Sequence, residues 1–110
     1  MKIILILFCF LSITGNVYAV ELVCKGDQQR FEGQRPIYVD CSNKQQVIDM
    51  LGAGWRELQK KGVAAPVADV CWNAYSRAQE VARNYHPSVS FEAPARSFLI
   101  QCNTSLQHIK

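Results

Sequence analysis

The 110-residue sequence has few of the groups on which catalytic and metal sites depend. It contains only two histidines, and it has no C-x-x-C pair, no G-x-S-x-G motif and no glycine-rich phosphate loop. His86 ends one predicted helix and His108 lies near the far end of the next. At 1.5 Å per helical residue they are about 20 Å apart, too far to act as an acid–base pair. We therefore expect no enzymatic activity, no metal and no cofactor.

Charge of one sign is not concentrated in any part of the chain. The sequence has 12 Lys and Arg against 9 Asp and Glu, a formal net charge of +3, and the cations are scattered. Sites for nucleic acids or lipid headgroups need clustered cations. We therefore expect no nucleic-acid partner.

Long hydrophobic runs are also missing, because the longest, Ile3–Leu11, has nine residues. A transmembrane helix needs about 20 apolar residues. Lys2 precedes the run, and Val17-Tyr18-Ala19 follows it with a small residue at the last position, as in a signal peptide. We predict a signal peptide over residues 1–19, cut after Ala19, and no membrane association after the cut. The alternative is an uncleaved signal anchor.

The cysteines agree with export. The sequence has five, and Cys9 leaves with the predicted signal peptide. The other four, Cys24, Cys41, Cys71 and Cys102, form an even set, as expected for two disulfides in an oxidising compartment. A zinc site would need reduced thiols. We therefore predict a periplasmic or secreted protein.

Residues 20–110 are sufficient for a single domain with a modest core. Residues 20–41 lack helical periodicity. The segments 21–24 and 36–39 have the composition of short extended pieces, and a polar stretch with Gly26 and Gly33 separates them. These features predict an irregular hairpin or arm.

Three amphipathic helices are predicted after the arm, at about 43–61, 66–85 and 94–109. Ser42 or Asn43 can cap the first, and Gly62 ends it. Pro66 suits the first turn of the second, and Pro87 follows its end. The apolar stripes of the three helices are Val47, Ile48, Leu51, Trp55 and Leu58; Val67, Cys71, Ala74, Ala78, Val81 and Tyr85; and Ala95, Phe98, Leu99, Cys102, Leu106 and Ile109.

The predicted fold is all-α: a small three-helix bundle with an N-terminal irregular or extended arm, stapled by two disulfides. Four cysteines allow three pairings. The second and third helices should pack antiparallel across a short loop, so we favour Cys71–Cys102, with Cys24–Cys41 flanking the arm. Gly52 and Gly54 in the first helix either permit a close helix contact or split the helix in two.

One surface is a candidate for partner binding. On the second helix, Trp72 falls outside the apolar stripe, with Gln79 and Arg83 on the same side. Ile100 is displaced in the same way on the third helix. An exposed Trp flanked by Arg is typical of protein-binding hot spots. We predict that these four residues bind a partner, and the alternative is that the arm, with residues 37–39, covers Trp72.

Together these features predict a small exported, non-enzymatic protein-interaction module whose partner is another protein of the envelope or extracellular space. An accessory factor of an envelope secretion or conjugation system fits, and so does an immunity-type inhibitor of an envelope-acting toxin. The alternatives are an acid-activated periplasmic chaperone and a secreted eukaryotic effector. Asn103-Thr104-Ser105 matches a glycosylation sequon, a match that often arises by chance.

Overall fold

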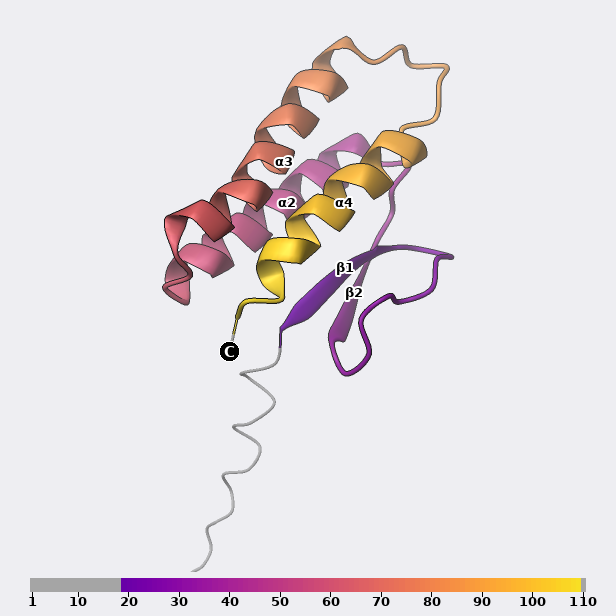
Figure 1. The fold of residues 1–110 in the computed structure, drawn as a ribbon. Helices are drawn as coiled ribbons and strands as arrows, with labels where there is room; N and C mark the ends of the chain where they lie inside the picture. The colour runs from indigo at the N-terminus through magenta and orange to yellow at the C-terminus, as the bar shows by residue number, and fades with distance from the viewer. Residues whose placement is uncertain (1–18, 110) are drawn as a thin grey trace, which may run out of the picture.

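The computed structural model describes residues 19–109, which form three helices and a two-stranded sheet (Figure 1). Apart from Ala19, the predicted signal peptide lies outside the described residues. Along the chain the elements are β1 (Val20–Cys24), β2 (Arg35–Val39), α2 (Lys44–Lys60), α3 (Ala65–Asn84) and α4 (Glu92–Leu106). Within residues 19–109, no helix has the length and hydrophobicity of a membrane-spanning segment.

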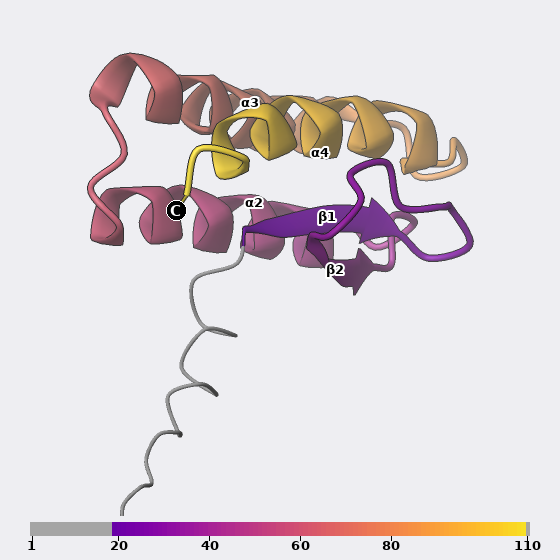
Figure 2. The same cartoon turned by 60° about the horizontal axis from the view of Figure 1, so that its bottom comes forward.

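The helices form a bundle, but the prediction of an all-α fold is wrong, because the arm is a sheet. β1 and β2 pair in parallel, with Val20 opposite Arg35 and Cys24 opposite Val39. A hairpin is antiparallel, so the hairpin prediction is also wrong. The loop 25–34 returns the chain from the end of β1 to the start of β2. Figure 2 shows α3 and α4 in one layer, and α2 with the sheet in the other.

A buried carboxylate holds the returning loop in place. Glu21 of β1 is only 1% exposed. Its two carboxylate oxygens accept hydrogen bonds from the backbone N–H groups of Arg30 and Phe31, at 2.8 and 2.9 Å. Because charged acceptors make stronger hydrogen bonds than neutral ones, this pair compensates the burial of the charge. The sheet thus depends on a charged residue that sequence periodicity does not single out.

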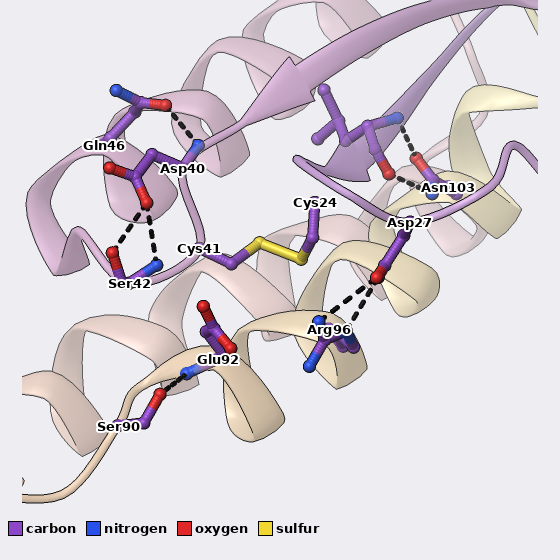
Figure 3. The surroundings of a disulfide bond; sticks show 11 residues. Cys24, Asp27, Asp40, Cys41, Ser42, Gln46, Ser90, Glu92, Arg96 and Asn103 are labelled. Atoms are coloured by element: carbon purple, nitrogen blue, oxygen red, sulfur yellow. Dashed lines mark hydrogen bonds and ion pairs between the residues drawn. A yellow bond between two sulfur atoms is a disulfide. The ribbon is translucent and has the colours of Figure 1, made fainter.

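The outer edge of β1 is closed by a side chain of α4. The Nδ2 of Asn103 donates to the carbonyl of Leu22 at 2.9 Å, and its Oδ1 accepts from the Leu22 N–H at 2.8 Å (Figure 3). The amide therefore takes the place of a neighbouring strand. Asn103 is 1% exposed, so a glycan on Nδ2 is incompatible with this fold, and the sequon match has no functional meaning in the folded protein.

At the outer edge of β2, a proline disfavours pairing with a further strand. The N–H of Arg35 donates to Ala19, and the carbonyl of Val39 accepts from Lys25, so alternate residues from Arg35 to Val39 face β1. Pro36 therefore faces away from β1, at a position where it offers no N–H to another strand. A cut after Ala19 would remove the first of these hydrogen bonds.

Both disulfides have the pairing favoured from the sequence. Cys24–Cys41 joins the last residue of β1 to the second residue after β2, with the Cα atoms 5.4 Å apart. Cys71–Cys102 joins α3 to α4, and both cysteines are fully buried. Because disulfides persist where the medium is oxidising, the two bonds are consistent with an oxidising extracellular compartment.

The two glycines of α2 allow close contact between helices and do not split the helix. α2 is continuous from Lys44 to Lys60, and Asn43 caps it by accepting a hydrogen bond from the N–H of Gln46 at 3.0 Å. A Cβ added at Gly54 would lie 3.1 Å from Sγ of Cys102. A Cβ added at Gly52 would lie 3.0 Å from the ring of Tyr75.

These contacts predict opposite effects for two otherwise identical substitutions. Gly54→Ala forces the new methyl against a buried disulfide that cannot move, so we expect a loss of about 1–2 kcal/mol of unfolding free energy despite the helix propensity gained. Gly52→Ala meets the far end of a half-buried ring that can swing outward, so we expect a gain of up to about 1 kcal/mol. Urea denaturation followed by circular dichroism measures both. Equal shifts in both variants would contradict this account.

Candidate functional site

The four residues predicted to bind a partner do not form one site. Ile100, on α4, lines a small hollow beside β1 and the loop that follows it, together with Arg96 and Asp27. Trp72, on α3, has its aromatic contacts with Trp55 of α2 and with Tyr75. Ile100 is therefore placed with the sheet, and Trp72 with the contact between α2 and α3.

Trp72 belongs to a partly exposed aromatic cluster. Its ring centroid is 4.5 Å from that of Trp55, at an interplanar angle of 46°, and 5.7 Å from that of Tyr75, in an edge-on geometry. Trp72 is 38% exposed, and Trp55 is half-buried rather than fully in the core. These two neighbours, not residues 37–39 of the arm, partly cover the indole.

Gln79 and Arg83 lie in an open groove about two and three turns beyond Trp72 along α3. The groove has a volume of about 400 Å³, and α2 and α3 both line it. Its apolar part is Ile48 and Ala82, and its cations are Lys44 and Arg83. The ion pairs of residues 19–109 are Glu57–Lys61 and Asp27–Arg96, so neither groove cation is neutralised by a carboxylate of the described chain.

The aromatic cluster and the groove are parts of one surface. α2 and α3 are antiparallel, because Gly52 faces Tyr75 while Ile48 shares the groove with Gln79. On α2 the residues are spaced by four and seven positions, and on α3 they follow one another at three or four positions up to the adjacent pair Ala82 and Arg83, so each set lies on one helix face. We call this surface the α2–α3 seam; its residues are Lys44, Ile48, Trp55, Trp72, Tyr75, Gln79, Ala82 and Arg83.

Three seam residues of α2 were missed from the sequence as binding residues: Lys44, Ile48 and Trp55. Ile48 and Trp55 belong to the apolar stripe of their helix and were expected in its interior. The signal in the sequence was Gly52, which lies between Ile48 and Trp55 on the same face of the helix. A glycine there removes the side chain that would separate the two helices, and it lets the ring of Tyr75 lie against α2.

Asp27 and Arg96 pin the loop after β1 to α4. Nε of Arg96 donates to Asp27 at 2.7 Å, and a second guanidinium nitrogen donates at 3.1 Å, close to the Cys24–Cys41 disulfide (Figure 3). The hydrogen bond from Arg96 holds the pKa of Asp27 below its ordinary value. Hydrogen bonds from Ser42 likewise lower the pKa of Asp40. The Asp27–Arg96 pair fastens the end of β1 to α4, the Asp40–Ser42 hydrogen bonds lie within the turn after β2, and neither pair lies on the seam.

The described residues offer no arrangement typical of a catalytic or metal site. Within residues 19–109, no group of three or more His, Cys, Asp or Glu side chains could hold a metal ion. His86, just after α3, shares a 2.7 Å hydrogen bond with Ser88, and His108 is exposed beyond the end of α4. The four cysteines described are all in disulfides.

The chain matches no protein-family model, and it shows no significant similarity to a curated protein or to a solved structure. The function therefore has to be argued from the surfaces of this molecule.

Proposed function

We propose that the protein is a small exported, non-enzymatic interaction module that binds another protein through the α2–α3 seam. The observation that carries this proposal is the exposed Trp72, packed between Trp55 and Tyr75 and continuous with a groove that holds two unneutralised cations. Aromatic residues and arginine are the residues most enriched in binding hot spots.

The chemistry of the seam supports a partner segment that is both apolar and acidic. Trp55, Trp72 and Tyr75 provide a large aromatic contact area. Each of these side chains has few rotatable bonds, so its immobilisation on binding costs little conformational entropy. Lys44 and Arg83 favour a carboxylate at the other end of the seam and speed association with an acidic surface. A partner loop with one or two apolar anchor residues followed by Asp or Glu would contact both the aromatic cluster and the cations of the groove.

The compartment supports two uses of such a surface. The disulfides suit an oxidising medium, and the N-terminal sequence predicts export. Within the bacterial periplasm, the proposal covers an accessory factor of a secretion or conjugation system and an immunity-type inhibitor of an envelope-acting toxin. Both depend on a rigid module that binds one protein.

Replacing the central indole tests the proposal. The disulfide-bonded protein is immobilised and exposed to an extract of its native envelope, captured proteins are identified by mass spectrometry, and the affinity for the specific partner is then measured. We expect Trp72→Ala to weaken that affinity by about 30-fold or more, the effect of removing a hot-spot side chain.

Val70→Ala provides the matched control. Val70 lies on the same helix, is 41% exposed and points away from Trp72, so this variant should bind as the wild type does. Circular dichroism must show native helix content for both variants. Equal affinity of the Trp72→Ala variant and the wild type would refute the seam as the binding surface.

A further inference from the structure

A second hollow lies on the other side of α2, where the helix faces the sheet. It is lined by Met50, Ala53, Gly54, Glu57 and Lys61, which recur at helical spacing on one face of α2. At 3.6 residues per turn, this face is almost opposite the face that carries Ile48 and Trp55. The hollow is therefore separate from the α2–α3 seam, and an argument about it does not rest on the proposed function.

The hollow has an apolar lining drawn from four elements. The residues that contribute this lining are Val20 and Leu22 of β1, Ile37 of β2, Met50, Ala53 and Gly54 of α2, and Leu106 and Ile109 at the end of α4. The sheet residues are cross-strand neighbours, since Leu22 pairs with Ile37 and Val20 with Arg35. The sheet thus presents one face to α2, and the small side chain of Ala53 leaves space between the helix and the sheet.

Charge is confined to a few side chains of the lining. Glu57 and Lys61 pair with each other, with an N–O distance of 3.9 Å. Arg35 has no ion-pair partner among residues 19–109, where the two ion pairs are Glu57–Lys61 and Asp27–Arg96. Counted over its side chains, the lining therefore carries one cation in excess, which would complement one negative charge.

We propose that this hollow, which we call the sheet–α2 pocket, binds a single aliphatic chain that ends in one carboxylate, a medium-chain fatty acid. The apolar lining would hold the chain, and Arg35 would bind the carboxylate, for which a guanidinium is well suited. Met50 can adapt its shape to a flexible chain.

The volume favours this occupant over larger ones. The sheet–α2 pocket has about 280 Å³. A buried cavity of about 150 Å³ accommodates benzene, so roughly twice that volume fits one chain of about ten carbons. Ligand pockets for larger molecules span about 300–1,000 Å³, and a two-chain lipid would exceed the space available.

Calorimetric titration of the disulfide-bonded protein with decanoate tests the proposal. We expect saturable binding at one site with a Kd on the order of 100 µM. Decyltrimethylammonium has the same chain with the opposite charge, and it should bind at least about tenfold more weakly, because its head would lie beside Arg35. Absence of saturable decanoate binding up to about 1 mM, or equal affinity for the two amphiphiles, would overturn the proposal.

Two variants test separately how the aliphatic chain and the carboxylate of the ligand contribute to binding. Arg35→Gln should weaken decanoate binding about tenfold, and Arg77→Gln, at an exposed arginine of α3, should not change it. Ala53→Phe should abolish binding by filling the pocket. If both Arg35→Gln and Ala53→Phe bind decanoate like the wild type, binding occurs elsewhere and the assignment is wrong.

A measurement on the unmodified protein avoids any question about the folding of variants. In methyl NMR spectra, decanoate should shift the signals of Ile37 and Ile109, which line the sheet–α2 pocket. Ile48 belongs to the groove on the seam and should not shift. Shifts at Ile48 without shifts at Ile37 would contradict the proposal, and they would identify the seam as the site of an apolar ligand.

Discussion

Replacing Cys71 and Cys102 together by alanine is expected to lower the free energy of unfolding by about 3 to 4 kcal/mol. The chain-entropy model gives this value for a closed loop of 31 residues. A small domain has a total stability of about 5–15 kcal/mol, so the variant loses a large part of it. The loss is enlarged by packing, because both cysteines are fully buried and Gly54 of α2 lies directly against the disulfide. Urea denaturation monitored by circular dichroism at 222 nm measures the change.

The second disulfide provides the comparison for this experiment. Cys24–Cys41 closes a loop of 17 residues, and it ties the sheet rather than the helices. Its removal should cost slightly less, about 3 kcal/mol, and should leave α3 and α4 packed against each other. A denaturation midpoint of the Cys71→Ala/Cys102→Ala variant equal to that of the wild type would show that helix packing alone holds the bundle.

The parallel sheet shows how far the sequence could predict the fold. The two extended segments were recognisable from their composition, but a connection of only eleven residues between them suggests a hairpin. The favoured disulfide already contradicted that hairpin. Cys24 ends the first segment and Cys41 follows the second, and in an antiparallel pair the ends of the two strands lie far apart. Their Cα atoms can lie 5.4 Å apart only because the strands run in the same direction.

The helices were predictable because their apolar stripes repeat along the chain, whereas the candidate site was predictable only in part. Trp72 stands out because it is a large aromatic residue outside the apolar stripe of its helix, with Gln79 and Arg83 on the same side. The contribution of α2 does not stand out, since Ile48 and Trp55 continue its stripe. Whether a stripe residue is interior or surface depends on which helix covers it. Pairing of α2 with α3 leaves both residues half-buried at the seam.

Asn103→Ala is expected to destabilise the protein by about 2 to 4 kcal/mol, more than most single substitutions do. The substitution removes two hydrogen bonds to the backbone of Leu22 in a buried position. The N–H and the carbonyl of Leu22 are then left without a partner, and each buried unsatisfied group costs about 1–3 kcal/mol. Because this amide is the contact that closes the edge of β1, the attachment of the sheet to α4 should weaken, and the denaturation midpoint in urea should fall.

Asn103→Asp separates the lost hydrogen bonds from a general packing defect, because the two side chains have nearly the same shape. An ionised carboxylate can still accept from the N–H of Leu22, but it opposes the Leu22 carbonyl and carries a buried charge. Burial raises the pKa of the introduced carboxyl above its unfolded value. The charge penalty is therefore complete above the folded pKa and disappears below the unfolded pKa of about 4, where the protonated group donates again. We expect the stability difference between this variant and the wild type to narrow as the pH falls from 7 to 4, while the difference for Asn103→Ala stays constant. A difference independent of pH in both variants would show that the two hydrogen bonds do not determine the stability of this edge.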